Sequence, residues 1–200
     1  CACVSPYART EMALKCGADL VLSLPVPYAT ASAERFASGG VAVLGGLGCV
    51  DALAFGTECD NTEMLKKCAE VLVSKDFSDT LNKYLDKGVS FPVARQKAVE
   101  EISGKEISGI LASPNNILGV EYIKAINKLG FDMDIKPITR KGVQHDSEEP
   151  NGDFCSASAI RGMLDNKENF TTFIPEECLN VLNEKIKNQK APANFDKLET

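Results

Sequence analysis

Hydrophobic and polar positions follow two patterns along the chain: short apolar runs bounded by turn residues, and longer stretches with helical spacing. The run from Leu20 to Leu24 is nearly all apolar and stops at Pro25, which is typical of a strand buried on both faces of a parallel sheet. Further short strands are predicted at 51–55, 109–112 and 135–139. Pro137 cannot donate to a ladder, so we expect the last strand near a sheet edge.

Helical spacing fills most of the chain between these runs. A helix of about four turns is predicted over 36–47, and Asp60 followed by Glu63 resembles a capping box that opens the next helix. The segment 76–106 is largely helical and is interpreted as a helical insertion. Three later helices are predicted to begin at Ser113-Pro114, at Ser156 and at Pro175.

Alternation of strands and helices predicts a three-layer α/β domain with a mostly parallel sheet. We expect this domain to cover 1–170, with 171–200 forming a C-terminal helix and a loose tail. In such domains ligands bind at the carboxyl ends of the strands. The predicted strand exits are therefore the places to look for chemistry: Leu24-Pro25, Phe55 to Glu58, Ala112 to Asn116, and Ile138 to Arg140.

Two of these exits carry candidate ligand-binding residues. Gly56 follows a predicted strand and would let a ligand approach the backbone closely, although turn formation also explains a glycine there. Asn115 and Asn116 offer amide donors and acceptors that suit a base edge, a ribose or a phosphate. An Asx turn with an N-cap is the alternative for these two residues.

A candidate anion site lies further along the chain. Ser158 and Arg161, at a predicted helix start, combine a hydroxyl and a guanidinium with unpaired backbone amides. A simple serine N-cap is the alternative. Arg140 adds a positive charge at the end of a predicted strand, and His145, the single histidine, follows in a polar loop where a structural hydrogen bond competes with a role as a general base.

Charge and composition narrow the classes of function. With 22 Lys+Arg against 28 Asp+Glu the net charge is -6, which argues against binding to a polyanion mainly by electrostatic attraction. A local basic patch is compatible with this net charge. The longest apolar runs fall far short of the ~20 residues that span a bilayer, and no signal peptide is indicated. The eight cysteines form no Cys-x-x-Cys, so core thiols in a reducing cytoplasm are predicted and no metal site is assigned.

Several segments resemble a known family. The most specific is Ser113-Pro114-Asn115-Asn116-Ile117-Leu118-Gly119, and the others are Tyr7 to Leu14, Gly17 to Val21, Leu24-Pro25, Tyr28 to Glu34, Phe55 to Glu58, and Ser156 to Arg161. In this order they resemble the Rossmann-like nucleotidyltransferase domain of the tRNA(Met) cytidine acetate ligase family, which is bacterial and cytoplasmic. The resemblance runs from about residue 5 to 185.

The resemblance implies an ATP-dependent ligase. Such an enzyme activates acetate as acetyl-adenylate and transfers the acetyl group to N4 of the wobble cytidine of elongator tRNA(Met). It also implies that Gly56, Asn115 and Arg140 contact ATP, with Asn116 beside them and Mg²⁺ accompanying the nucleotide. Ser158 and Arg161 would belong to the phosphate-facing helix start, and no catalytic residue is assigned.

One departure from the family pattern shapes the expectation. Members begin with a strand and a loop of the H-x-G-H type, which these 200 residues do not contain. We therefore expect a fragment or a degenerate member, with a shortened C-terminal region, that has little or no acetylation activity alone. Two other functions remain open: a non-catalytic nucleotide-binding module, and an adenylyltransferase with a small-molecule acceptor.

Overall fold

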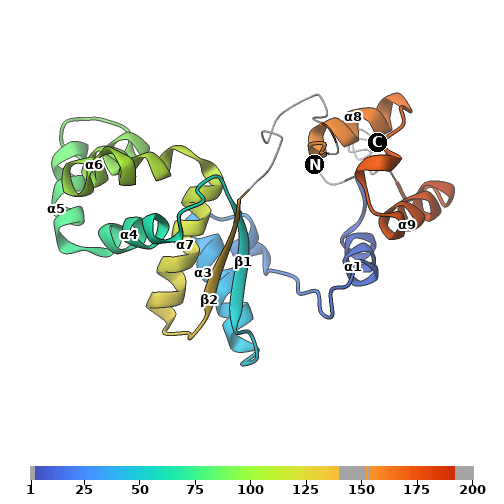
Figure 1. The fold of residues 1–200 in the computed structure, drawn as a ribbon, viewed down its shortest axis with the longest axis horizontal. Helices are drawn as coiled ribbons and strands as arrows, with labels where there is room; N and C mark the ends of the chain where they lie inside the picture. Colours follow the sequence, from blue (N-terminus) through green and yellow to red (C-terminus); the bar gives the residue numbers. More distant parts are fainter. Residues whose placement is uncertain (1–2, 140–151, 153, 192–200) are drawn as a thin grey trace. The chain divides into compact units, whose positions relative to one another are not determined.

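The computed structural model describes residues 3–139, 152 and 154–191, and most of them are helical (Figure 1). The chain divides into two compact units. Unit 1 combines Cys1–Ser23 with Lys141–Thr200, and unit 2 is the intervening segment Leu24–Arg140. Each unit has its own hydrophobic core, so each is described separately.

Unit 2 is organised around a two-stranded parallel sheet. Strand β1 (Ala52–Thr57) pairs with β2 (Asp134–Thr139) along its whole length. The pairing brings Phe55 opposite Pro137 and Thr57 opposite Thr139. Because strands joined in parallel need a long crossover, the 76 residues between β1 and β2 are available to form helices.

Helices α3 (Ala33–Gly46) and α7 (Pro114–Leu129) cover one face of this sheet. Val41, Ala125 and Ile126 are buried there against Leu53 and Ile135 of the strands. The side chains of Ala52 and Ala54 lie on the opposite, exposed face. Side chains along β1 therefore alternate between a face covered by helices and an exposed face, among the described residues.

A second group of helices forms the larger core of unit 2. It consists of α4 (Thr62–Val73), α5 (Lys75–Leu85), α6 (Phe91–Gly109) and the 3₁₀ helix η1 (Ile110–Ala112), packed on α7 (Figure 1). Leu65, Cys68, Val99 and Val120 are fully buried at its centre. The short helix α2 (Val26–Ala29) precedes α3.

Unit 1 packs helices from both ends of the chain. These are α1 (Pro6–Lys15), α8 (Ala157–Asn166), η2 (Thr171–Phe173) and α9 (Glu176–Lys187). Their core contains Val4, Ala8, Val181 and Leu182. The predicted helix starts at Ser156 and Pro175 are confirmed, because both residues occupy N-cap positions.

Two predicted strands are wrong. Residues 20–24 take no regular secondary structure, and Leu20 is 59% exposed. Residues 109–112 end α6 and form η1, with Ile110 buried in the helical core. A short apolar run becomes a strand only when a neighbouring strand pairs with its backbone groups, and neither run has such a neighbour among the described residues.

Other predicted elements agree with the structure. The parallel pairing is confirmed, and β1 continues two residues past the predicted end, to Thr57. The segment 76–106 is largely helical as predicted, with α5 and α6 separated by 86–90. The cap of α4 is Asn61 and not Asp60, because the Asn61 side chain accepts hydrogen bonds from the amides of Glu63 and Met64.

Candidate functional site

The carboxyl end of β1 meets the first turn of α7 through one buried side chain. Asn116 is 5% exposed, and its Oδ1 accepts a hydrogen bond from Thr57 Oγ1 at 2.6 Å. The same oxygen accepts the backbone amides of Glu58 and Cys59, both at 2.9 Å. Asn116 therefore holds the loop that leaves β1, and we call this loop with the start of α7 the β1–α7 rim (Gly56–Cys59 and Ser113–Asn116).

Asn115 has a different environment from its neighbour. It is half-buried, and its Nδ2 donates to Glu58 Oε1 at 2.6 Å. Consecutive residues in the first turn of a helix point in different directions, so one amide faces the protein and the other lies at the surface of the rim. The sequence left open which of the two could face a ligand, and this arrangement favours Asn115.

The rim also presents backbone donors. Ser113 is the N-cap of α7 but makes no side-chain capping bond, and Pro114 lacks an amide hydrogen. The first-turn amides of a 16-residue helix carry a partial positive charge and suit an anion. Gly56 is exposed on β1, one residue before Thr57 and opposite Ile138 of β2.

The packing beneath the rim depends on a close approach between β1 and α7. A Cβ placed on Gly119 would lie 2.5 Å from Cε2 of Phe55, so only glycine fits without a shift of the ring. The Phe55 ring also packs on Tyr122, with their centroids 5.5 Å apart. Burial raises the pKa of Tyr122, which keeps its hydroxyl protonated in this contact.

The other predicted site residues belong to unit 1 or are not among the described residues. Arg140 and His145 fall outside the described residues. Ser158 and Arg161 lie on α8 in unit 1, where Arg161 Nη2 donates to Ser158 Oγ at 2.9 Å. Ser156 Oγ caps this helix by accepting the amide of Ala159 at 3.0 Å. The structure therefore joins Asn116 to Thr57 and Asn115 to Glu58, the two residues that follow Gly56.

Reasoning from the sequence missed Thr57 and Glu58 as members of the rim. Thr57 is fully buried and donates to Asn116, while Glu58 accepts from Asn115. The sequence signal that could have found them is the pair of polar residues directly after an apolar strand. A buried polar side chain at such a position needs a hydrogen-bond partner from another element. The partners came from a segment 57 to 59 residues away.

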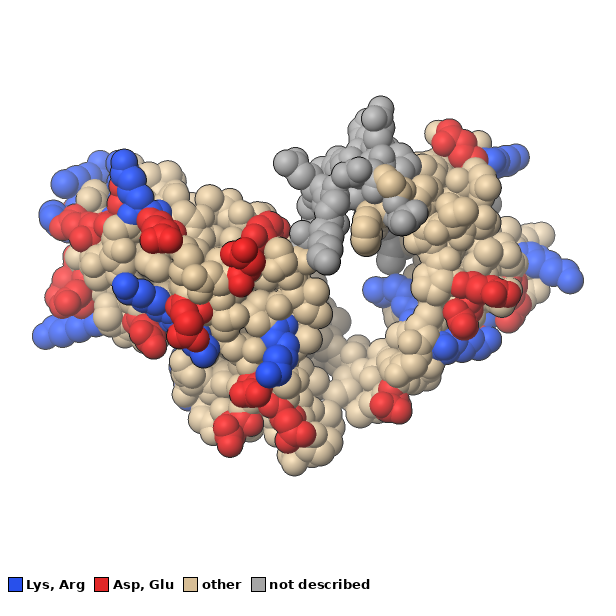
Figure 2. All heavy atoms as spheres, viewed as in Figure 1, with Lys and Arg blue, Asp and Glu red and all other residues tan. Residues whose placement is uncertain are grey.

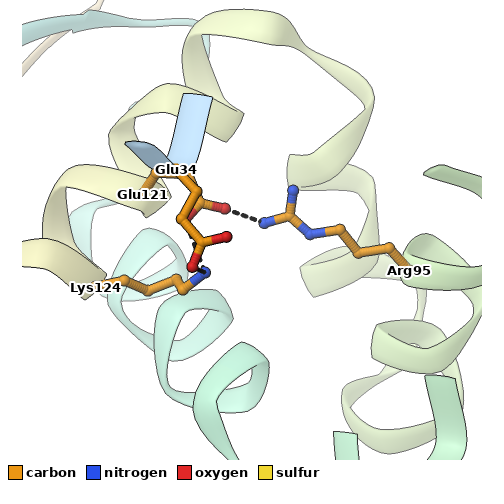
Figure 3. Close-up of polar contacts among 4 residues, drawn as sticks. All are labelled: Glu34, Arg95, Glu121 and Lys124. Carbon is orange, nitrogen blue, oxygen red and sulfur yellow. Dashed lines mark hydrogen bonds and ion pairs between the residues drawn. The ribbon is translucent and has the colours of Figure 1, made fainter. Parts of the chain in front are cut away.

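A buried charge network in unit 2 was also missed. Glu121 of α7 is 4% exposed and pairs with Arg95 of α6 and with Lys124 one turn along, at 2.7 Å (Figure 3). Lys124 also lies 3.8 Å from Glu34 of α3. These ion pairs connect three helices, and each buried charge has an opposite charge beside it.

A cavity of about 510 Å³ lies next to this network. Its walls come from α3, α4 and α7 and include Glu34, Glu121, Lys124 and Lys128. Gly56, Asn115 and Asn116 are not among its lining residues, so it is separate from the β1–α7 rim.

The charged surface of unit 2 is mixed. Figure 2 shows Lys and Arg side chains interspersed with Asp and Glu side chains over its helices. Such mixing is consistent with nearly balanced numbers of basic and acidic residues, 22 Lys+Arg and 28 Asp+Glu, which give the chain a net charge of -6. In the described ranges, no helix combines the length and the apolar character that crossing a bilayer would need.

Comparison with known proteins places these observations in a family. The model of the HIGH Nucleotidyl Transferase family matches residues 1–200, so the chain belongs to the HIGH nucleotidyltransferases. Within that class it is similar to curated proteins called tRNA(Met) cytidine acetate ligase, which confirms the resemblance noted in the sequence. One, from Thermoanaerobacter sp. (strain X514), is 38% identical over 98% of this chain and 50% of its own length. Another, from Alkaliphilus metalliredigens (strain QYMF), is 41% identical over 86% of this chain and 44% of its own length.

Solved structures of one relative share the fold. Apo TmcAL of Thermotoga maritima aligns with a TM-score of 0.87 and 34% identity over 96% of this chain and 47% of that chain. The same protein bound with alpha-thio ATP aligns with a TM-score of 0.82 and 34% identity over 95% of this chain and 46% of that chain. The chain spans about half the length of the curated relatives it matches.

Proposed function

We propose that this chain is the nucleotide-binding part of an ATP-dependent ligase that acetylates N4 of the wobble cytidine of elongator tRNA(Met), in the cytoplasm. The observation that carries the proposal is the contact of Asn116 with Thr57 and of Asn115 with Glu58, directly after Gly56, where the α7 N-terminus meets the carboxyl end of β1. Its domain would be of the Rossmann-like nucleotidyltransferase class, in which nucleotides bind at this edge of the sheet.

The chemistry of the rim suits adenylation. In the proposed reaction a carboxylate oxygen of acetate attacks the α-phosphorus of ATP, forms acetyl-adenylate and releases pyrophosphate. The N4 amine of cytidine then attacks the acetyl carbon and releases AMP. Fixed amide donors and cations are needed where charge develops on the phosphates, and the α7 N-terminus and Asn115 would supply donors there.

Separate roles follow for the proposed site residues. Gly56, Asn115 and Arg140 would contact ATP. Asn116 would position the loop after β1 for nucleotide binding, because it accepts two backbone amides of that loop. Ser158 and Arg161, at the start of α8 in unit 1, are proposed to bind a phosphate group. Mg²⁺ would arrive with ATP on its phosphate oxygens, and Glu58 is the carboxylate on the rim that suits this ion.

Nucleotide binding is the first test. Isothermal titration of the 200-residue chain with ATP and Mg²⁺ should give saturable binding, and Asn115→Ala should weaken it about tenfold through loss of a hydrogen bond to a charged group. Asn82→Ala, at an exposed position of α5, is the matched control and should bind like the parent. No saturable binding to the parent chain would refute the proposal.

Acetylation is the second test, made with the polypeptide that carries this chain. ATP, acetate and tRNA(Met) should yield acetylcytidine, AMP and pyrophosphate. Pyrophosphate release that depends on a small-molecule acceptor and not on tRNA would instead favour the other adenylyltransferase. ATP binding without any pyrophosphate release would favour a non-catalytic nucleotide-binding module.

A further inference from the structure

Two thiols in unit 1 lie in contact although they are far apart in sequence. Cys16 is the C-cap of α1 and Cys178 is in the first turn of α9, 162 residues later. Their Sγ atoms are 3.3 Å apart. The described residues contain no group of three or more His, Cys, Asp or Glu side chains that could hold a metal, so a shared metal does not account for this pair.

The helices hold the two thiols together without help from the sulfurs. Glu11 of α1 and Lys185 of α9 form an ion pair of 3.1 Å, and the hydrogen bond from Lys185 is the main reason that the pKa of Glu11 is lowered. Ala8 is buried in the same core as Val181 and Leu182. Because packing sets the approach of α1 and α9, the thiols can react with little rearrangement of the backbone.

The thiols differ in access. Cys16 is exposed, whereas Cys178 is half-buried. Burial, followed by the neighbouring Cys16, raises the pKa of Cys178 to about 11. A small oxidant therefore reaches Cys16 first, and Cys178 is placed to attack the sulfur of Cys16 in a second step.

We propose that Cys16 and Cys178 are a reversible dithiol–disulfide site that small-molecule disulfides such as glutathione disulfide oxidise. The Cys16 thiolate attacks glutathione disulfide, forms a mixed disulfide and releases one glutathione. The Cys178 thiolate then displaces the second glutathione from Cys16 and closes the protein disulfide. Two protein thiols are oxidised, one glutathione disulfide is reduced to two glutathiones, and the thiol protons pass to the released glutathiones.

This disulfide would have one structural consequence. Cys16 precedes unit 2 in the chain and Cys178 follows it, so the closed loop would contain all of Leu24–Arg140. The bond would tie α1 to α9 and would keep the two halves of unit 1 joined when the packing between them opens.

Peptide mapping tests the proposal on the full 200-residue chain. After equilibration with reduced and oxidised glutathione at pH 8, acid quench and alkylation, trypsin should release a linked pair of peptides, 16–35 and 168–185. Cys16→Ser and Cys178→Ser should each abolish it, and Cys16 should remain as the glutathione adduct in Cys178→Ser. Cys49→Ser removes an exposed thiol of unit 2 and should leave the linked pair unchanged.

A comparison with unfolded protein makes the test independent of how the variants fold. The same equilibration in urea should lower the yield of the linked pair ~tenfold, because eight cysteines then compete and a loop of 162 residues is costly to close. An equal yield in urea would overturn the proposal, as would glutathione adducts on both residues of the native chain without the linked pair.

Discussion

Asn116 Oδ1 accepts the hydroxyl of Thr57 at 2.6 Å, and this bond joins the end of β1 to the first turn of α7. The two residues are 59 positions apart in the sequence. The same oxygen accepts two backbone amides of the loop after β1, so a single carboxamide orders three donors. Loss of that oxygen would leave the buried hydroxyl of Thr57 and the amide of Glu58 without this acceptor, whereas the amide of Cys59 also donates to Thr57 Oγ1 at 3.0 Å.

We therefore expect Asn116→Ala to lower the free energy of unfolding by about 2–4 kcal/mol, because the buried Thr57 hydroxyl and the Glu58 amide lose their acceptor. Asn116→Asp keeps an acceptor in the same place and lies at a helix N-terminus that favours negative charge, so its stability should stay within about 1 kcal/mol of the parent. Urea unfolding followed by circular dichroism measures both. An Asp variant as unstable as the Ala variant would show that the acceptor is not what matters.

Gly119 provides a steric test of the contact between β1 and α7. Gly119→Ala places a methyl group 2.5 Å from the ring of Phe55, so we expect a loss of about 1–3 kcal/mol in thermal or urea unfolding. Phe55→Leu in the same chain should recover part of the loss by removing the ring atom that clashes. Gly162→Ala, in α8 with nothing within 4 Å of the new Cβ, is the control and should be neutral or stabilising by up to about 1 kcal/mol.

The buried ion network predicts unequal effects of two similar substitutions. Glu121→Gln removes the charge shared by Arg95 and Lys124 and should cost about 3–5 kcal/mol, because two poorly hydrated cations lose their partner. Glu34→Gln should cost less than about 1 kcal/mol, since Glu34 is 68% exposed and 3.8 Å from Lys124. Equal losses of unfolding free energy in the two variants would contradict the burial seen here.

Cys68 makes stability depend on pH in the alkaline range. Burial raises the pKa of its thiol from 9.0 to about 11, so the folded state disfavours the thiolate more than the unfolded state does. Its contribution is fully present below pH 9 and is lost as the pH rises from about 9 to 11, by about 2–3 kcal/mol in total. Tyrosines and lysines titrate in the same range, so the measurement is the difference between the pH profiles of the parent and of Cys68→Ala. Parallel profiles would refute the assignment to Cys68.

The thiols also show how far a local pattern predicts burial. The core-thiol interpretation is correct for Cys68, which lies on the apolar stripe of α4. It is wrong for Cys16 and Cys49, which are exposed. Cys16 follows the last residue of α1 and is the C-cap of that helix. Helical periodicity predicts the side a residue faces only while the helix continues.

The sequence by itself predicted helices α3 to α9, the helix starts at Ser113, Ser156 and Pro175, strands near 51–55 and 135–139 in a parallel sheet, and the family. Helices and caps are satisfied by groups a few residues away, so local spacing is enough to predict them. Only the tertiary structure decided that 20–24 and 109–112 form no strand, that Asn116 and not Asn115 faces inward, and that Glu121 is a buried charge. Each of these outcomes depends on a partner that is distant in the sequence, because a strand needs a neighbouring strand and a buried polar group needs a hydrogen-bond or ionic partner.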